Sequence, residues 1–378
     1  MLPRDSDDEV IYTTLAAKIR AKGLSSYNLR DTSIDPNAEF WKLSYRENGN
    51  LLALLADSGI SYYDTNLYFN PPLFPVFLSF SHGLFNKDAS YLALKRGVKN
   101  FRFRYEQLYL VFPNAVFSVL FLAAVFFFGK DFFGEKEGAL AALCCAVSPV
   151  FLVVVFKTWS DMLAVALLAW SFLLWRKRDS TRFNVFLSAF LFGLAVLTRT
   201  ASLFGVFIFF TRRWRQFSLW TLVVVIVTAP WFYAFYKNYG TPFYFPEAGQ
   251  VKQNVDWFKF ISRPWYFYVV DLLYMTPLFL PGLLAWEKKS RILVAWVLSF
   301  LLPLSVLIYT RKPLGLEDRY LLPCYPALAA LAARGIEKLE GCLPRYLTVI
   351  FIAAACVWSL KTAFFLIISR ESLVFVPY

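Results

Sequence analysis

Histidine is the scarcest functional side chain in this sequence. His82 is the only one among 378 residues, so a metal site built from several histidines is excluded, and so is a histidine base at any other position. If the chemistry of the protein needs a general base, a carboxylate must supply it. The five cysteines lie in or near apolar stretches and not in the outer loops, a distribution typical neither of a disulfide framework nor of a metal site.

Charged residues make up only 17% of the chain, whereas hydrophobic residues make up 58% and the mean hydropathy is +0.50. These values exclude an ordinary soluble globular protein. Four of the apolar runs are shorter than the roughly 17 residues that usually cross a bilayer, but short helices are tolerated where neighbouring helices or an aqueous cavity surround them. We therefore predict an all-α polytopic membrane protein with about ten transmembrane helices. The apolar runs are 107–128, 138–156, 161–175, 183–197, 200–211, 218–236, 265–286, 292–309, 320–333 and 346–368.

The distribution of positive charge excludes a nucleic-acid partner. The net charge is +13, but the basic residues are concentrated in every second connection between apolar runs, with 15 Lys and Arg in 42 residues against 9 in 45 residues of the alternating set. This is the positive-inside pattern of a membrane protein, and it differs from the basic face or arm of a nucleic-acid-binding protein. The basic loops, which we place in the cytoplasm, are 129–137, 176–182, 211–217, 287–291 and 333–346.

This topology divides the chain into an outer, extracytoplasmic loop, residues 1–104, and a transmembrane helical domain, residues 105–378. The loop is nearly neutral, with 13 basic and 11 acidic residues. We expect two juxtamembrane helices in it: an amphipathic one over residues 10–22, and an interfacial one over residues 73–80 that Gly83 closes. Neither a signal peptide nor a span precedes the loop, so we also expect an additional transmembrane helix upstream.

Charged residues recur on the outer side of the predicted bundle, at the ends of short apolar runs. Lys157 and Asp161 lie between two runs, Arg199 lies between two more, and Arg319 begins another beside Tyr320. Ionisable groups at membrane depth are costly and typically functional. For any one of them an ordinary charged helix end is an equally good explanation, and the functional interpretation depends on finding several on one side.

An acidic pair, Asp8-Glu9, opens the outer loop on the same side of the membrane. Carboxylates suit deprotonation of a hydroxyl acceptor, and several cations suit an anionic phosphate and its stabilisation as a leaving group. A lipid-phosphate donor places its tail between helices and its phosphate at the interface. The pattern therefore predicts sugar transfer from a polyprenyl-phosphate-linked donor to an acceptor hydroxyl at the outer face. A lipid or sugar transporter without transfer activity is the alternative, and a catalytically inactive homologue is a third interpretation.

Six short motifs follow one another along residues 8–328, each weak alone. They are Asp8-Glu9-Val10-Ile11-Tyr12; Asn70-Pro71-Pro72-Leu73; Phe133-Gly134 through Ser148-Pro149; Ser160-Asp161-Met162; Gly193-Leu194-Ala195 to Thr198-Arg199; and Arg319-Tyr320-Leu321-Leu322-Pro323 with Tyr325-Pro326-Ala327-Leu328. In this order the chain resembles the GT-C superfamily of integral membrane glycosyltransferases. Within it, the chain is most similar to the protein O-mannosyltransferase and lipid A aminoarabinose transferase branch.

The resemblance implies a role for each matching residue. Asp8 would act as the general base on the acceptor, with Glu9 and Asp161 beside it. The family's usual outcome, inversion at the anomeric carbon, needs one base and a good leaving group. No metal site is evident in the sequence, although the oxygen ligands of these acids leave a divalent cation open. The residues expected to bind the donor phosphate are Arg199, Arg319, Tyr320 and Lys157.

Two features depart from related patterns. Asn70 stands where many relatives have Lys or His, which weakens any donor-binding role there. The Trp-Trp-Asp acceptor motif of the oligosaccharyltransferases in the same superfamily does not occur. The expected partners are a polyprenyl-phosphate sugar donor, membrane lipids, and a glycan, lipid or protein acceptor.

The two outer arginines give a geometric prediction. Two cations close together in a low-dielectric groove repel each other, so an anion between them is a physical reason to keep both. We predict that Arg199 and Arg319 converge on one anionic group. The alternative pairs each arginine with a nearby acid, for example Arg319 with Glu317 or Asp318.

Overall fold

The computed structural model describes scattered residues between Tyr12 and Gly23 and six longer segments, and within these all regular structure is helical. The described positions are 12, 15–17, 19–20, 23, 71–85, 108–177, 181–210, 214–239, 266–310 and 318–369. The helices are α5 (Leu73–Leu84), α7 (Leu108–Phe132), α8 (Glu135–Ala146), α9 (Pro149–Val155), α10 (Asp161–Arg176), α11 (Arg182–Val196), η4 (Thr200–Gly205), α12 (Val206–Phe209), α13 (Trp214–Tyr239), α14 (Phe267–Met275), η7 (Pro277–Leu284), α15 (Arg291–Thr310), η8 (Asp318–Cys324), α16 (Tyr325–Cys342) and α17 (Arg345–Ser369).

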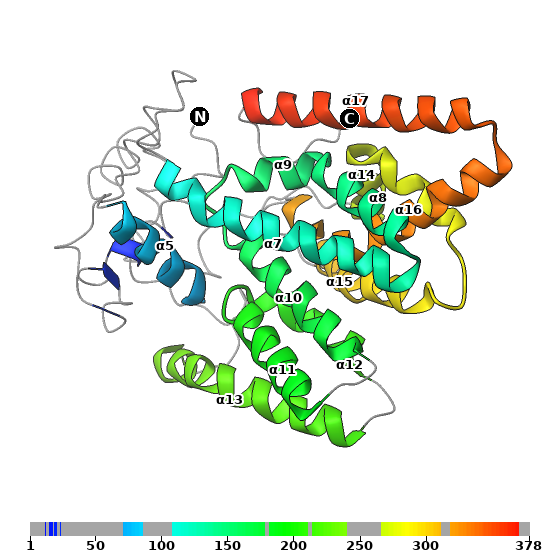
Figure 1. Cartoon of the computed structure of the whole chain (residues 1–378). Coiled ribbons are helices and arrows are strands. Elements are labelled where there is room, and N and C mark those ends of the chain that lie inside the picture. Colours follow the sequence, from blue (N-terminus) through cyan, green and yellow to red (C-terminus); the bar gives the residue numbers. More distant parts are fainter. Residues whose placement is uncertain are drawn as a thin grey trace.

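The long helix α7 crosses the middle of the molecule and contacts elements from most of the sequence (Figure 1). It packs against α5, α8, α10 and α16. From α10 the packing continues outward to α11 and then to α13, which lies along one edge, while α17 lies along the opposite edge against α9 and η7. Helices from distant parts of the sequence, such as α5 and α16, are therefore assembled around one central helix.

Two hydrophobic cores flank α7. One contains Phe121, Phe151 and Tyr325 and joins α7 to α9, α14 and α16. The other is aromatic: the Trp296 ring lies edge-on to Phe172, with 4.9 Å between ring centroids. Offset and edge-to-face rings are the arrangement that aromatic quadrupoles favour. The second core holds α10, α11 and α15 together, and these helices carry or adjoin the candidate site.

Glycine permits two very close backbone approaches. A Cβ added to Gly129 on α7 would lie 2.7 Å from the Cα of Gly138 on α8, and a Cβ added to Gly335 on α16 would collide with the carbonyl oxygen of Pro281 in η7. No side chain larger than that of glycine fits at either position. Small residues that let helix backbones meet are typical of helix packing in membranes, so these contacts fix α8 on α7 and η7 on α16.

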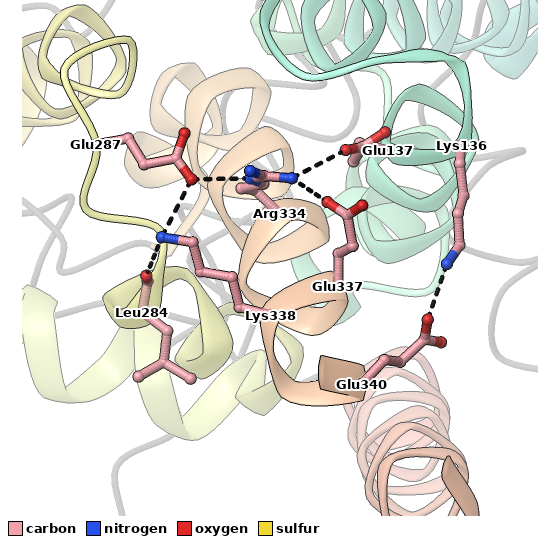
Figure 2. Close-up of polar contacts among 8 residues, drawn as sticks. All are labelled: Lys136, Glu137, Leu284, Glu287, Arg334, Glu337, Lys338 and Glu340. Atoms are coloured by element: carbon pink, nitrogen blue, oxygen red, sulfur yellow. Dashed lines mark hydrogen bonds and ion pairs between the residues drawn. The ribbon is translucent and has the colours of Figure 1, made fainter. Parts of the chain in front are cut away.

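An ion cluster joins α8, the loop after η7, and α16 (Figure 2). Arg334 pairs with Glu137 at 3.5 Å, with Glu287 at 3.0 Å, and with Glu337. Lys338 also pairs with Glu287, at 3.1 Å, so one carboxylate is shared by two cations. The hydrogen bonds of Lys338 and Arg334 lower the pKa of Glu287 below its usual value. The cluster binds three elements at the face that the charge pattern predicts to be cytoplasmic.

Three described helical stretches are long and apolar enough to cross a membrane, or up to five if each of two bent pairs forms one span. The predicted count of about ten is not confirmed. Helices α8 and α9 form one bent pair with an angle of 67°, and α14 and η7 form the other, at 110°. Both breaks precede a proline, which lacks an N–H and cannot continue the preceding hydrogen-bond ladder. The unbroken stretches are Phe112–Phe132, Trp214–Ala234 and Arg345–Phe364.

The outer region is described only in part. The described residues from Tyr12 to Arg20 are helical, and the Gly23 N–H donates to the Ile19 carbonyl at 2.8 Å with a φ of +72°, a left-handed end that favours glycine. The prediction that Gly83 closes the interfacial helix is wrong, because α5 continues to Leu84. One glycine costs a helix only about 1 kcal/mol relative to alanine, so Gly83 is accommodated in the last turn.

Candidate active site

Asp161 is the first residue of α10, and Ser160 precedes it as the N-cap. The turn that delivers it begins after Phe156, where α9 ends. A carboxylate in the first turn of a helix is stabilised by the unpaired N–H groups and the dipole there. Burial is nearly complete, since Asp161 is 2% exposed. The anionic side chain is therefore fixed inside the bundle.

Two arginines from separate elements meet at this carboxylate. Arg199, which precedes η4, pairs with the Oδ1 atom of Asp161, and Arg319 in η8 places its Nη1 atom 3.7 Å from Oδ2. Their side chains are 20% and 6% exposed, respectively. Arg199 and Arg319 converge on one anionic group, as predicted. The group is Asp161, an acid of the chain at neither of the positions considered for Arg319, and not the phosphate that motivated the prediction.

Aromatic rings cover the two guanidinium groups. The Arg319 guanidinium lies over the Trp159 ring at 4.2 Å from the centroid, and the Arg199 guanidinium lies over the Tyr320 ring at 4.8 Å. Arg319 is also 5.6 Å from the Tyr320 centroid. Stacking on ring faces stabilises the cations and fixes the direction of their N–H groups. The structure thus places the Tyr320 ring next to both arginines.

Lys157 lies at the edge of this group. Its Nζ atom lies over the Trp159 ring, 5.4 Å from the centroid, on the same turn that leads to Asp161. Trp159 itself is 1% exposed. One indole ring therefore contacts a cation from its own turn and another from η8. Five of the predicted site residues are therefore brought together, linked by ion pairs to Asp161 and by cation–ring contacts to Trp159 and Tyr320. They are Lys157, Asp161, Arg199, Arg319 and Tyr320.

Asn114, on α7, holds the turn through its side-chain amide, and it was not among the predicted site residues. Its Nδ2 atom donates to the carbonyl oxygens of Lys157 at 2.5 Å and Trp159 at 2.9 Å. Asn114 is fully buried. A buried amide must find partners to offset its desolvation. A lone Asn after Pro113 inside an otherwise apolar run was the available signal.

Tyr12 holds the same turn from the other side. Its hydroxyl and the Ser160 Oγ atom are hydrogen bonded at 2.8 Å in a buried contact. The Tyr12 ring packs edge-on against Phe74 of α5, with 5.1 Å between centroids. The backbone N–H of Leu73 donates to the carbonyl of Leu197 at 3.1 Å, which ties α5 to the turn that carries Arg199. Residues from four of the sequence motifs thus meet at one place.

The remaining predicted residues lie outside the described part of the chain. Asp8 and Glu9, predicted as the base and its neighbour, are among them, and so are Glu317 and Asn70. Over the described residues, no group of three or more His, Cys, Asp or Glu side chains could hold a metal ion. Arg199 and Arg319, with the rings of Trp159 and Tyr320, form a cradle of cations and aromatic rings around the Asp161 carboxylate. A group of cations of this kind suits an anionic ligand.

Comparison with known proteins places this geometry in context. The sequence model of the family of dolichyl-phosphate-mannose-protein mannosyltransferases matches residues 102–233. No curated protein sequence matches the chain significantly. Among solved structures, the chain is similar to ArnT from Cupriavidus metallidurans in the apo state, at 16% identity and a TM-score of 0.57, over 92% of this chain and 58% of that one.

Two further solved structures share the fold. ArnT from C. metallidurans bound to undecaprenyl phosphate is matched at 14% identity and a TM-score of 0.55, over 96% of this chain and 66% of that one. The Archaeoglobus fulgidus oligosaccharyltransferase tethered with an acceptor peptide is matched at 13% identity and a TM-score of 0.56, over 99% of this chain and 52% of that one. The chain thus spans between half and two thirds of their lengths, and at these identities the likeness is one of fold. The chain is thus similar in sequence to that mannosyltransferase family over residues 102–233, and similar in fold to ArnT and to the archaeal oligosaccharyltransferase.

Proposed function

We propose that the protein transfers a sugar from a polyprenyl-phosphate-linked donor to an acceptor hydroxyl at the outer face of the membrane, with inversion at the anomeric carbon. The observation that carries the proposal is the convergence of Arg199 and Arg319 on one buried anionic point at Asp161. A cradle of this kind suits a phosphate, because guanidinium groups bind phosphate oxygens through parallel hydrogen bonds.

In this proposal the cations act on the leaving group. Arg199 and Arg319 hold the donor phosphate, the Tyr320 ring lies next to both, and Lys157 adds a cation at the edge. As the bond from the anomeric carbon to the phosphate oxygen breaks, its electron pair leaves with the lipid phosphate. Cations already in place stabilise that growing charge without reorganisation.

The other half of the reaction needs a base. Asp8, with Glu9 beside it, takes the proton of the acceptor hydroxyl, and the acceptor oxygen attacks the anomeric carbon from the face opposite the phosphate. The oxygen atoms of Asp161 are engaged by two arginines, which makes Asp161 better suited to organise the cations than to accept a proton. Its placement beside Ser160 and Tyr12 links it to the segment that begins with Asp8.

The related structures support the donor class. ArnT from C. metallidurans binds undecaprenyl phosphate, and the A. fulgidus oligosaccharyltransferase takes an acceptor peptide. The present chain shares their fold. By the positive-inside pattern, the turns of Lys157–Asp161 and Arg199 lie on the outer side, where a lipid-linked phosphate is accessible at the interface.

A transfer assay in detergent tests the proposal. Purified protein is given a panel of polyprenyl-phosphate sugars with glycan, lipid and peptide acceptors, and the release of polyprenyl phosphate and glycosylated product is measured together. Transfer by the wild type and its loss in Arg319→Gln support the function. Vesicles that show lipid or sugar translocation with no transfer to any acceptor would instead identify a transporter.

A further inference from the structure

The carboxylate of Asp161 occupies the point where the two phosphate-binding arginines meet. Each of its oxygen atoms faces a different guanidinium group, Oδ1 that of Arg199 and Oδ2 that of Arg319. Asp161 cannot withdraw easily by rotation of the backbone, because it starts α10 and its turn is held by Asn114 and Tyr12. An external anion that binds both arginines must therefore compete with this carboxylate for the hydrogen bond of Arg199 and for the longer ion pair of Arg319.

The charge on the lipid phosphate changes during the proposed reaction. A polyprenyl-phosphate sugar is a phosphodiester with a single negative charge. The polyprenyl monophosphate that leaves is a monoester, which carries about 1.5 to 2 negative charges at neutral pH. Two buried arginines hold the more highly charged species more tightly, because charge-assisted hydrogen bonds strengthen in a low dielectric. Without a competitor, such a site retains its product.

We propose that Asp161 is a specificity-determining residue that acts as an internal competitor for the lipid phosphate. Its carboxylate re-forms its ion pairs with Arg199 and Arg319 when the phosphate leaves. It therefore lowers the affinity of the site for polyprenyl monophosphate and promotes product release. The inference rests on the proposed function, since it assumes that these arginines bind the donor phosphate. It differs from a simple positioning role, in which the carboxylate only orients the arginines and its loss weakens binding.

The two roles predict opposite signs for one measurement. Binding of undecaprenyl monophosphate and of the uncharged C55 polyprenol to the full chain in nanodiscs is measured by native mass spectrometry. In Asp161→Asn the monophosphate binds about tenfold more tightly than in the wild type, the effect of freeing one charge-assisted contact. The polyprenol, which has no phosphate, binds equally to both proteins.

Matched variants separate competition from a general change in charge. Glu135→Gln removes one negative charge from an exposed residue paired with Lys130 and leaves the affinity unchanged. Asp161→Glu keeps the competing carboxylate and stays within about threefold of the wild type, well below the tenfold change expected for the asparagine variant. Equal or weaker binding of the monophosphate to Asp161→Asn overturns the inference and leaves the proposed function intact. A wild type that does not prefer the monophosphate over the polyprenol overturns both.

A second comparison serves if Asp161→Asn does not fold. Removing one partner of a buried charge pair is strongly destabilising, whereas removing both partners is tolerated better. Asp161→Asn combined with Arg199→Gln is therefore compared with Arg199→Gln alone. Tighter monophosphate binding by the double variant supports competition for Arg319, and weaker binding overturns it.

Discussion

The side-chain amide of Asn114 donates to the carbonyl oxygen of Trp159 at 2.9 Å, and so joins α7 to the turn that begins the candidate site. The same amide reaches the carbonyl of Lys157. Along α7, Asn114 lies 15 residues from Gly129, or about 22 Å at 1.5 Å per residue. One helix thus holds the site near its beginning and α8 near its end.

Replacement of Asn114 by alanine removes the donor from the carbonyl oxygens of Lys157 and Trp159, of which the Trp159 contact is buried. We expect Asn114→Ala to lower the free energy of unfolding by about 1–3 kcal/mol. Transfer should fall further than this loss explains, because a displacement of about 1 Å at a catalytic group costs on the order of 10²-fold. Thermal unfolding in detergent and turnover at a temperature where the variant is folded check both effects.

The control is Ser118→Ala, one turn further along α7. Ser118 is also buried, but within the described part of the chain its hydroxyl donates to the Asn114 carbonyl of its own helix and to no other element. This variant should lose little turnover. Unchanged transfer by folded Asn114→Ala would show that the turn keeps its shape without the amide.

Tyr12→Phe tests the second support of the turn. The substitution removes the hydrogen bond to Ser160 and keeps the ring contact with Phe74. A double-mutant cycle with Ser160→Ala should give a coupling of about 0.5–1.5 kcal/mol in unfolding free energy. We also expect turnover to fall, because the hydrogen bond joins the segment that begins with Asp8 to the turn that presents Asp161. Additive single effects would contradict this arrangement.

The sequence predicted the helical class and the gathering of five site residues, and the physical reasons are clear. Charges such as Asp161 and Arg199 stand out in apolar surroundings because their burial is costly. The helix breaks were harder to predict. The run over 138–156 was read as one span, but Ser148 caps α9 and Pro149 begins it, so the run bends by 67°.

Contacts between distant residues could not be read from the sequence. Asn114 reaches carbonyl groups more than 40 positions away, and backbone acceptors have no sequence signature. Arg319 was considered with its neighbours Glu317 and Asp318, yet the structure also brings it to Asp161 through the packing of η8 against α10. The residue type shows that a buried side chain such as that of Arg319 needs a polar or charged partner. Which residue becomes that partner depends on the tertiary packing.

Asp8→Asn tests the base. We expect turnover to fall by about 10² to 10⁴-fold, the usual effect of removing a general base. Binding of the donor should persist, because the arginine cradle is unchanged. Transfer rates and donor affinities of Asp8→Asn and Glu9→Gln are compared with the wild type. Near-normal transfer by Asp8→Asn would move the proton acceptor to another carboxylate.

Acid should weaken the ion cluster around Arg334. The pKa of Glu287 is lowered in the folded protein by the hydrogen bonds of Lys338 and Arg334, from a reference value of 4.5. A lowered pKa contributes stability that is present above the reference value and lost as the pH falls through the folded value. Thermal unfolding in detergent should therefore show a midpoint that decreases below about pH 4.5. In Glu287→Gln this decrease should be smaller, and an identical profile would exclude Glu287 as a contributor.

Gly335→Ala tests the close backbone contact between α16 and η7. An added Cβ would collide with the Pro281 carbonyl oxygen and would lie 2.9 Å from the Gly282 nitrogen. Backbone atoms cannot rotate away as a side chain does, so η7 must separate from α16, and we expect a loss of about 1–3 kcal/mol or more in unfolding free energy. Gly341→Ala is the matched control on the same helix, because no atom lies within 4 Å of its added Cβ. Alanine there should be neutral or stabilise by up to about 1 kcal/mol through helix propensity. Equal unfolding midpoints for the two variants would show that α16 and η7 do not pack this closely.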